Sequence, residues 1–109
     1  MKITIYTKKI KLTSDLKNYV EKKIGHLEKY TDKILEARVE LDEDKSQQSG
    51  FKYRAEVTMF LPKYSFRAQE TTTDIFAAID LVIPKLKKQI EMYKTKFEEP
   101  KRGIKGIRD

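Results

Sequence analysis

Two runs of alternating apolar and polar residues in the middle of the chain restrict its fold more than any other feature. The apolar members of the first run are Leu35, Ala37, Val39 and Leu41. Those of the second run are Phe51, Tyr53, Ala55, Val57, Met59 and Leu61. Strict alternation is typical of strands that bury one face, and a polar segment ending in Gly50 separates the runs. We therefore predict a β-hairpin with one apolar and one solvated face.

Shorter alternating segments predict one more strand on either side of this hairpin. Ile3 and Ile5 indicate a first strand near the N-terminus. Tyr64, Phe66 and Ala68 indicate a fourth strand after the hairpin. The chain is thus expected to contribute four strands to its sheet.

Two other segments space their apolar residues three and four apart, which predicts two amphipathic helices. The first helix is expected to begin at Thr13 or Ser14 and to end near Tyr30. Its apolar residues are Leu16, Val20, Ile24 and Leu27. The second helix follows N-cap candidates at residues 71–74, and its apolar residues are Ile79, Ile83, Leu86, Ile90, Tyr93 and Phe97. Pro84 lies inside it and predicts a bend, because proline removes a helical hydrogen bond.

The order β-α-β-β-β-α indicates an α+β fold. Both helices must cover the single apolar face of the sheet, which gives a two-layer sandwich. A right-handed crossover through the first helix would place the first strand parallel to the second, so a four-stranded mixed sheet is expected. We predict one domain over residues 1–99 and a basic, flexible tail over residues 100–109.

Composition and motifs exclude several classes of protein. The 109 residues include no cysteine, which argues against zinc fingers, thiol redox enzymes and disulfide scaffolds. No apolar run approaches the roughly 20 residues of a membrane-spanning helix, and no signal peptide is recognisable. Because no signal peptide is recognisable, we expect a cytoplasmic location. The sequence has one histidine and no glycine-rich phosphate loop, so we expect neither catalysis nor a bound metal or cofactor. The acidic residues 42–44 are interpreted as a solvated run, with a weak divalent-cation site as the alternative.

Positive charge gathers toward the C-terminus. The net charge is +7, and residues 85–109 contain 9 of the 24 basic residues but only 4 of the 17 acidic ones. Concentrated positive charge attracts polyanions over long distances. Charge alone leaves a solubilising surface without a partner as the alternative.

Both predicted helices carry basic residues on their exposed sides. On the first helix, a stripe about 60° wide lies opposite the apolar stripe. It holds Lys22, His26 and Lys29, with Lys33 in line just beyond the predicted helix end and Lys23 on the shoulder of the stripe. On the second helix, the two flanks of the apolar stripe carry Lys85, Lys88 and Lys96 and, opposite them, Lys87 and Lys94. Two ridges about 10 Å apart can straddle RNA phosphates, whereas a lysine-rich solvated surface is the alternative. A protonated imidazole would add charge below neutral pH.

Exposed aromatic residues that could stack on bases are few. Tyr6 and Phe60 are the candidates, and each could instead seal the core. The predominance of lysine over arginine favours neutralisation of phosphates over recognition of base edges. We therefore expect contacts with the shape and backbone of an RNA.

Four blocks of the sequence carry a specific pattern: Leu12-Thr13-Ser14-Asp15-Leu16, Lys23-Ile24-Gly25-His26-Leu27-Glu28-Lys29-Tyr30, Asp74-Ile75-Phe76-Ala77-Ala78-Ile79-Asp80 and Lys85-Leu86-Lys87-Lys88-Gln89. With these blocks the chain resembles the bacterial family of ribosome hibernation-promoting factors and ribosome-associated translation inhibitors. The blocks occur in the order and spacing of the family, within residues 1–97. The resemblance implies a fold akin to double-stranded RNA-binding domains and binding to rRNA of the small ribosomal subunit.

The resemblance also implies a place of action. Family members dock at the decoding region between head and body, where they compete with mRNA and tRNA, block translation and preserve idle ribosomes under stress or in stationary phase. The basic contacts of the family carry over onto Lys23, Lys29, Lys85 and Lys88. His26 stands where members usually have lysine, and Met92 and Pro84 replace usually polar residues.

The chain looks like a short form of the family, or a fragment of a long form. It is not expected to pair ribosomes by itself, which leaves a helper factor for ribosome dimerisation open. Two other functions stay open on the sequence: a general double-stranded RNA-binding module acting off the ribosome, and a protein-interaction module that meets an acidic partner.

Overall fold

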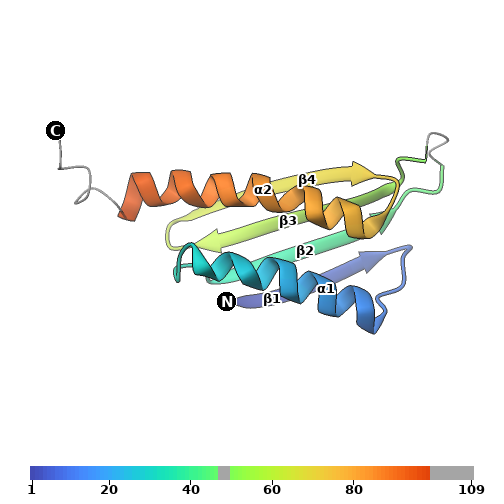
Figure 1. The fold of residues 1–109 in the computed structure, drawn as a ribbon, viewed down its shortest axis with the longest axis horizontal. Helices are drawn as coiled ribbons and strands as arrows, with labels where there is room; N and C mark the ends of the chain where they lie inside the picture. Colours follow the sequence, from blue (N-terminus) through green and yellow to red (C-terminus); the bar gives the residue numbers. More distant parts are fainter. Residues whose placement is uncertain (47–49, 99–109) are drawn as a thin grey trace.

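The computed structural model describes residues 1–46 and 50–98, and its elements follow the predicted order (Figure 1). The strands are β1 (Lys2–Lys8), β2 (Glu36–Glu43), β3 (Tyr53–Leu61) and β4 (Tyr64–Thr72). The helices are α1 (Ser14–Gly25) and α2 (Ile75–Tyr93), followed by the 3₁₀ helix η1 (His26–Lys29) and the π-helix η2 (Lys94–Glu98), respectively. The predicted tail over residues 100–109 lies outside the described residues.

The four strands form one mixed sheet in the order β1-β2-β3-β4. β1 runs parallel to β2, with Ile5 beside Val39, and the other neighbouring pairs are antiparallel. Both helices lie on the same face of this sheet (Figure 1). The predicted α+β sandwich with a four-stranded mixed sheet is therefore confirmed.

Side-chain caps explain where the two helices begin. Thr13 Oγ1 accepts a hydrogen bond from the Leu16 amide at 3.2 Å, and Asp74 Oδ2 accepts one from the Ala77 amide at 3.2 Å. Each cap satisfies an amide that has no partner inside the first turn of its helix. Thr13 and the segment 71–74 were the predicted starting points.

The core fills the space between the helices and the sheet. Val20 and Ile24 of α1 and Leu86 of α2 are fully buried, in one cluster with Ala37 and Met59 of the sheet. Because each helix buries one stripe, its opposite side faces solvent. This packing places the basic stripes of both helices on the same side of the molecule.

Three aromatic or aliphatic residues predicted to lie in the core are instead exposed. Leu35 precedes the first residue of β2 and is 60% exposed, because Ile34 occupies the buried position there. Phe51 precedes β3 and is 54% exposed, since the ladder that would hold it inward begins only at Tyr53. Phe97 is 46% exposed because the wider turn of η2 breaks the angular spacing on which its burial was predicted.

The two helices differ from expectation in their ends and regularity. α1 ends at Gly25, and the tighter η1 continues to Lys29 with Tyr30 as its C-cap, so the helical segment ends near Tyr30 as predicted but its last turn is 3₁₀. α2 continues without interruption through the exposed Pro84, so the bend expected there stays a prediction. No helix in the described part of the chain is long and apolar enough to cross a bilayer.

Candidate nucleic-acid interface

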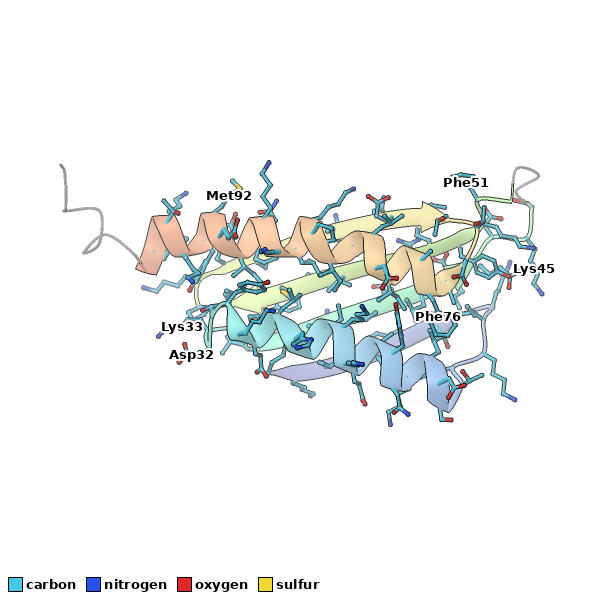
Figure 2. All side chains as sticks on the ribbon, in the orientation of Figure 1. Asp32, Lys33, Lys45, Phe51, Phe76 and Met92 are labelled. Carbon is cyan, nitrogen blue, oxygen red and sulfur yellow. The ribbon has the colours of Figure 1, made fainter. Side chains whose placement is uncertain are left out.

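All eight residues predicted to bind rRNA lie on the helical layer of the sandwich. Lys22 and Lys23 come from α1, His26 and Lys29 from η1, Lys85, Lys87 and Lys88 from α2, and Lys94 from η2. Lys23, Lys87 and Lys94 are half-buried, and the other five are exposed. Figure 2 shows the side chains that stand on this layer. The burial of the apolar stripes underneath is what turns these basic residues to solvent.

Tyr30 joins the basic residues of the two helices. The Lys29 Nζ lies 5.2 Å from the centroid of the Tyr30 ring, and the Lys87 Nζ lies 5.1 Å from the same centroid. The electron-rich face of an aromatic ring attracts ammonium groups at such distances. Tyr30, which directly follows η1, is thus contacted by one lysine from each half of the chain.

Neither of these two lysines forms an ion pair within the described part of the chain. Glu28, the acidic neighbour of Lys29, is bound instead by the amino group of Met1 at 2.7 Å. Because neither ammonium group has a carboxylate partner among the described residues, an anion could bind either one without displacing a resident charge. We name Lys29, Tyr30 and Lys87 the two-lysine site.

Two other predicted contacts are already paired with carboxylates. The Lys23 Nζ lies 3.8 Å from Asp80 Oδ1. The Lys85 Nζ lies 2.6 Å from Glu70 Oε2 and donates a 3.3 Å hydrogen bond to the Gln69 carbonyl. An RNA phosphate would have to compete with these carboxylates for the two ammonium groups.

Asp80 also ties α1 to α2. It accepts a 2.5 Å hydrogen bond from the Tyr19 hydroxyl, and the Tyr19 ring packs edge-on against Phe76 with centroids 5.0 Å apart. The hydrogen bond to Asp80 is the largest cause that raises the pKa of Tyr19 to about 12, followed by burial. This contact fixes the relative position of the helices that carry the basic residues.

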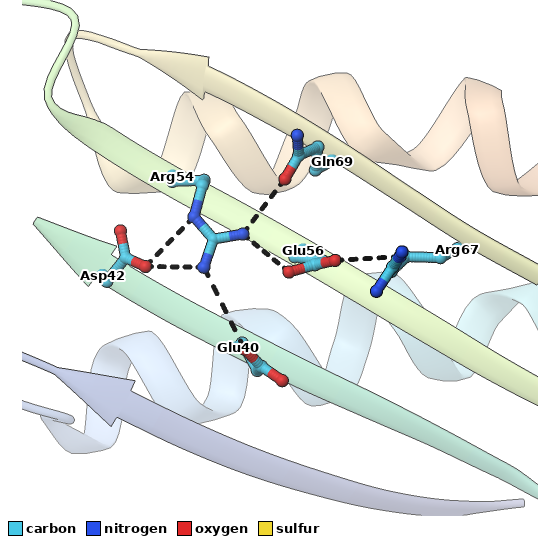
Figure 3. A network of polar contacts seen from close by, with 6 residues as sticks. All are labelled: Glu40, Asp42, Arg54, Glu56, Arg67 and Gln69. Atoms are coloured by element: carbon cyan, nitrogen blue, oxygen red, sulfur yellow. Dashed lines mark hydrogen bonds and ion pairs between the residues drawn. The ribbon is translucent and has the colours of Figure 1, made fainter.

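The opposite face of the sheet is charged but neutralises itself. Arg54 on β3 binds Asp42 Oδ2 through two hydrogen bonds of 2.6 and 3.0 Å, and it binds Glu56 at 2.6 Å (Figure 3). Arg67 in turn lies 3.1 Å from Glu56. Hydrogen bonds to Asp42 and then Glu56 raise the pKa of Arg54 further above its ordinary value. The basic helical layer and this balanced face therefore differ in their attraction for polyanions.

The same network accounts for the acidic run at residues 42–44. Asp42 is engaged by Arg54, and Glu43 lies 3.5 Å from the Lys52 Nζ. No group of three or more metal-ligating side chains occurs among the residues that the structure describes. The alternative of a divalent-cation site gains no support from this geometry.

Tyr6 and Phe60 do not join the basic layer. Both residues lie at strand positions that face away from the helices: Tyr6 pairs with Glu40, and Phe60 pairs with Glu36. Tyr6 is 53% exposed, and the Phe60 ring lies 5.0 Å below the Arg38 guanidinium. Neither residue seals the core, and neither lies near the two-lysine site.

Sequence reasoning missed Tyr30, Asp80 and Glu70 as parts of this interface. Tyr30 stands directly after Lys29, but an aromatic residue at a helix end more often packs on the core, and Tyr30 is indeed half-buried. Only the packing of α1 against α2 shows that Lys87 shares its ring. A paired carboxylate is equally invisible without the fold.

Comparisons with known proteins agree with the fold and the resemblance. Residues 3–98 match the family model described as sigma 54 modulation protein / S30EA ribosomal protein. The ribosome hibernation promotion factor of Deinococcus radiodurans is 34% identical over 88 residues, which cover 81% of this chain and 46% of that protein. The protein of the same name from Staphylococcus aureus is 32% identical over 102 residues, which cover 94% and 53%, respectively. The chain thus spans about half the length of these relatives.

Two solved structures share the fold. The N-terminal domain of Thermus thermophilus Protein Y superposes with a TM-score of 0.75 at 32% identity, covering 85% of this chain and 99% of that one. A ribosomal subunit interface protein from Coxiella burnetii superposes with a TM-score of 0.74, covering 87% and 99%. At 23% identity, the second likeness concerns the fold alone.

Proposed function

The chain belongs to the family of sigma 54 modulation protein and S30EA ribosomal protein, and from this premise we propose that it acts as a ribosome hibernation factor. It binds rRNA of the small subunit in the channel that otherwise holds mRNA and tRNA. By occupying that channel, the protein blocks translation. The observation that carries the proposal is the two-lysine site, where Lys29 and Lys87 meet at the Tyr30 ring without a carboxylate partner in the described part of the chain.

The chemistry of the basic layer suits a phosphate-rich groove. Lysine ammonium groups neutralise phosphates as point charges and do not read base edges as arginine forks do. A rigid helical layer with charge on two neighbouring helices can contact both walls of an RNA groove through shape and backbone. Such a protein inhibits by occupying space, and it needs no chemical step.

The direct test is cosedimentation with vacant small subunits at increasing salt concentration. We expect association at low salt that weakens steeply, since each neutralised phosphate lowers the slope of log K against log salt by about 0.7 to 0.9. Addition of mRNA with tRNA should displace the protein. The absence of association at low salt would refute the proposal, and preferential binding to non-ribosomal duplex RNA would favour a general RNA-binding module.

Charge reversal supplies matched controls for this test. Replacing Lys85 and Lys88 with glutamate should weaken binding strongly, because it places negative charge on the basic layer. Glu36→Lys on the opposite sheet face should leave binding nearly unchanged. Equal effects of both changes would mean that the helical layer is not the binding surface.

A further inference from the structure

Four aromatic rings form a cluster where α2 ends beside the β3–β4 turn. We call Tyr64, Phe66, Tyr93 and Phe97 the terminal aromatic cluster. The Tyr64 ring lies 5.8 Å from both Tyr93 and Phe97 between centroids, and Tyr93 lies 5.0 Å from Phe97. Phe66 completes the cluster at 6.1 Å from Tyr64. Rings at these separations pack against one another and hold each other's orientation.

The cluster is buried on one side and open on the other. Tyr93 and Phe66 are only 5% and 8% exposed, so they close this end of the core. Phe97 is 46% exposed and Tyr64 is half-buried. The last helical turn, which carries Phe97, projects past the end of the sheet (Figure 1). An aromatic ring that is fixed from below but open to solvent offers a free surface for stacking.

Basic residues belong to the same turns as the open rings. The Lys96 Nζ lies 5.7 Å from the centroid of the Phe97 ring. Lys94 belongs to the same turn, and the exposed Lys63 belongs to the turn that leads into Tyr64. Within the described part of the chain, Lys63, Lys94 and Lys96 form no ion pair. Aromatic rings interleaved with basic side chains are typical of single-strand RNA-binding surfaces.

We propose that the Phe97 ring of the terminal aromatic cluster, supported by Tyr64, stacks on an unpaired nucleobase of an RNA. Lys96 and Lys63 contact the phosphates on either side of that base. This inference rests on the proposed function and deepens it, because it adds a base contact to the phosphate contacts of the helical layer. Stacking on a ring tolerates any base, so the site selects single-stranded RNA and not a sequence.

The test uses tryptophan fluorescence, because the chain contains no tryptophan. The variant Phe97→Trp places the only indole in the terminal aromatic cluster. Tyr6→Trp is the matched control, since Tyr6 is 53% exposed and lies on the opposite sheet face. Each variant is titrated with a single-stranded oligoadenylate of about ten nucleotides, a length within the range of known single-strand sites. A backbone of the same length without bases serves as the second probe.

We expect the oligoadenylate to quench the fluorescence of Phe97→Trp, the abasic backbone to leave it nearly unchanged, and neither probe to quench Tyr6→Trp. A stacked base quenches an indole on contact, whereas a phosphate alone does not. No quenching of Phe97→Trp by the oligoadenylate would overturn the proposal. Equal quenching by the abasic backbone, or in the Tyr6→Trp control, would overturn it as well.

A second variant separates stacking from simple apolar packing. Phe97→Leu keeps an apolar side chain but lacks a ring face, so affinity for the oligoadenylate should fall by roughly five- to a hundredfold. Thermal unfolding of the variant verifies that it folds. Unchanged affinity would contradict stacking.

Cosedimentation of the same variants with vacant small subunits distinguishes the two proposals. If Phe97→Trp binds subunits but its fluorescence does not respond to RNA, the stacking proposal fails and the proposed function stands. If the oligoadenylate quenches it but no subunit binding occurs, the stacking site stands and the ribosomal function fails.

Discussion

Glu70 on β4 holds the side chain of Lys85 on α2 in an ion pair with 2.6 Å between Oε2 and Nζ. One of the residues expected to contact rRNA is therefore already bound by a carboxylate of the same chain. Both side chains are partly exposed, which limits the strength of the pair. Under the proposed function, an incoming rRNA phosphate would have to replace Glu70 at this lysine.

The substitution Glu70→Gln should accordingly strengthen binding to small subunits. Exposed ion pairs contribute about 0.2 to 1 kcal/mol, so the dissociation constant should fall by up to about fivefold at low salt. Glu40→Gln is the matched control, because it removes the same charge from the opposite sheet face. Cosedimentation measures the binding of both variants. An equal gain in affinity for Glu70→Gln and Glu40→Gln would show that only the net charge of the protein determines binding.

Each lysine of the two-lysine site should contribute one phosphate contact to the salt dependence of binding. Lys29→Ala and Lys87→Ala should each make the negative slope of log K against log salt shallower by about 0.7 to 0.9, the value of one phosphate contact. Lys2→Ala removes an exposed lysine from β1 and should leave the slope unchanged. Titrations at several salt concentrations measure these slopes. A change of slope for Lys2→Ala that equals or exceeds the change for Lys87→Ala would contradict the assignment.

The sequence predicts the sheet and the helix faces well because both depend on local periodicity. Ala37, Val39 and Leu41 are buried as their alternation predicts, and the N-cap at Thr13 forms as expected. Local patterns fail at the ends of elements, since the partner strand determines where a ladder begins. Leu35 continues the pattern of β2 but lies before its first residue, so it is exposed.

The candidate site is predictable in its lysines but not in their partners. A helical wheel finds Lys29 and Lys87 separately, each on the exposed side of its own helix. Their meeting at Tyr30 depends on how α1 and η1 pack beside α2. Likewise, only the position of β4 beneath α2 reveals that Glu70 neutralises Lys85.

Pro84 should limit the stability of α2. It lies inside the helix, where proline removes a backbone hydrogen bond and costs up to about 3 kcal/mol. Because the residue is exposed, Pro84→Ala should raise the free energy of unfolding by about 1 to 3 kcal/mol without loss of core packing. Urea unfolding measures the change. A less stable variant would mean that the ring of Pro84 contributes to a bend on which the packing of α2 depends.

The contact between Tyr19 and Asp80 should make stability depend on alkaline pH. The pKa of Tyr19 is raised from 10.0 to about 12 by its hydrogen bond to Asp80, so folding favours the neutral phenol. The resulting stabilisation is complete below pH 10 and is lost as the pH rises through about 12. In urea unfolding, wild type should therefore lose more stability across this interval than Tyr19→Phe does. Parallel losses in the two proteins would show that the hydrogen bond does not control the titration.

Tyr30 should matter for RNA binding through its ring and not through its hydroxyl. Tyr30→Phe keeps the ring that attracts both ammonium groups, so it should bind small subunits like wild type. Tyr30→Leu removes about 0.5 to 1 kcal/mol of attraction for each lysine, so both side chains should become more mobile. Because mobile lysines lose more entropy when they bind phosphates, affinity should fall several-fold. Cosedimentation of the two variants decides the matter, with thermal unfolding to verify their folds. Equal binding by Tyr30→Leu and Tyr30→Phe would show that the ring does not position Lys29 and Lys87.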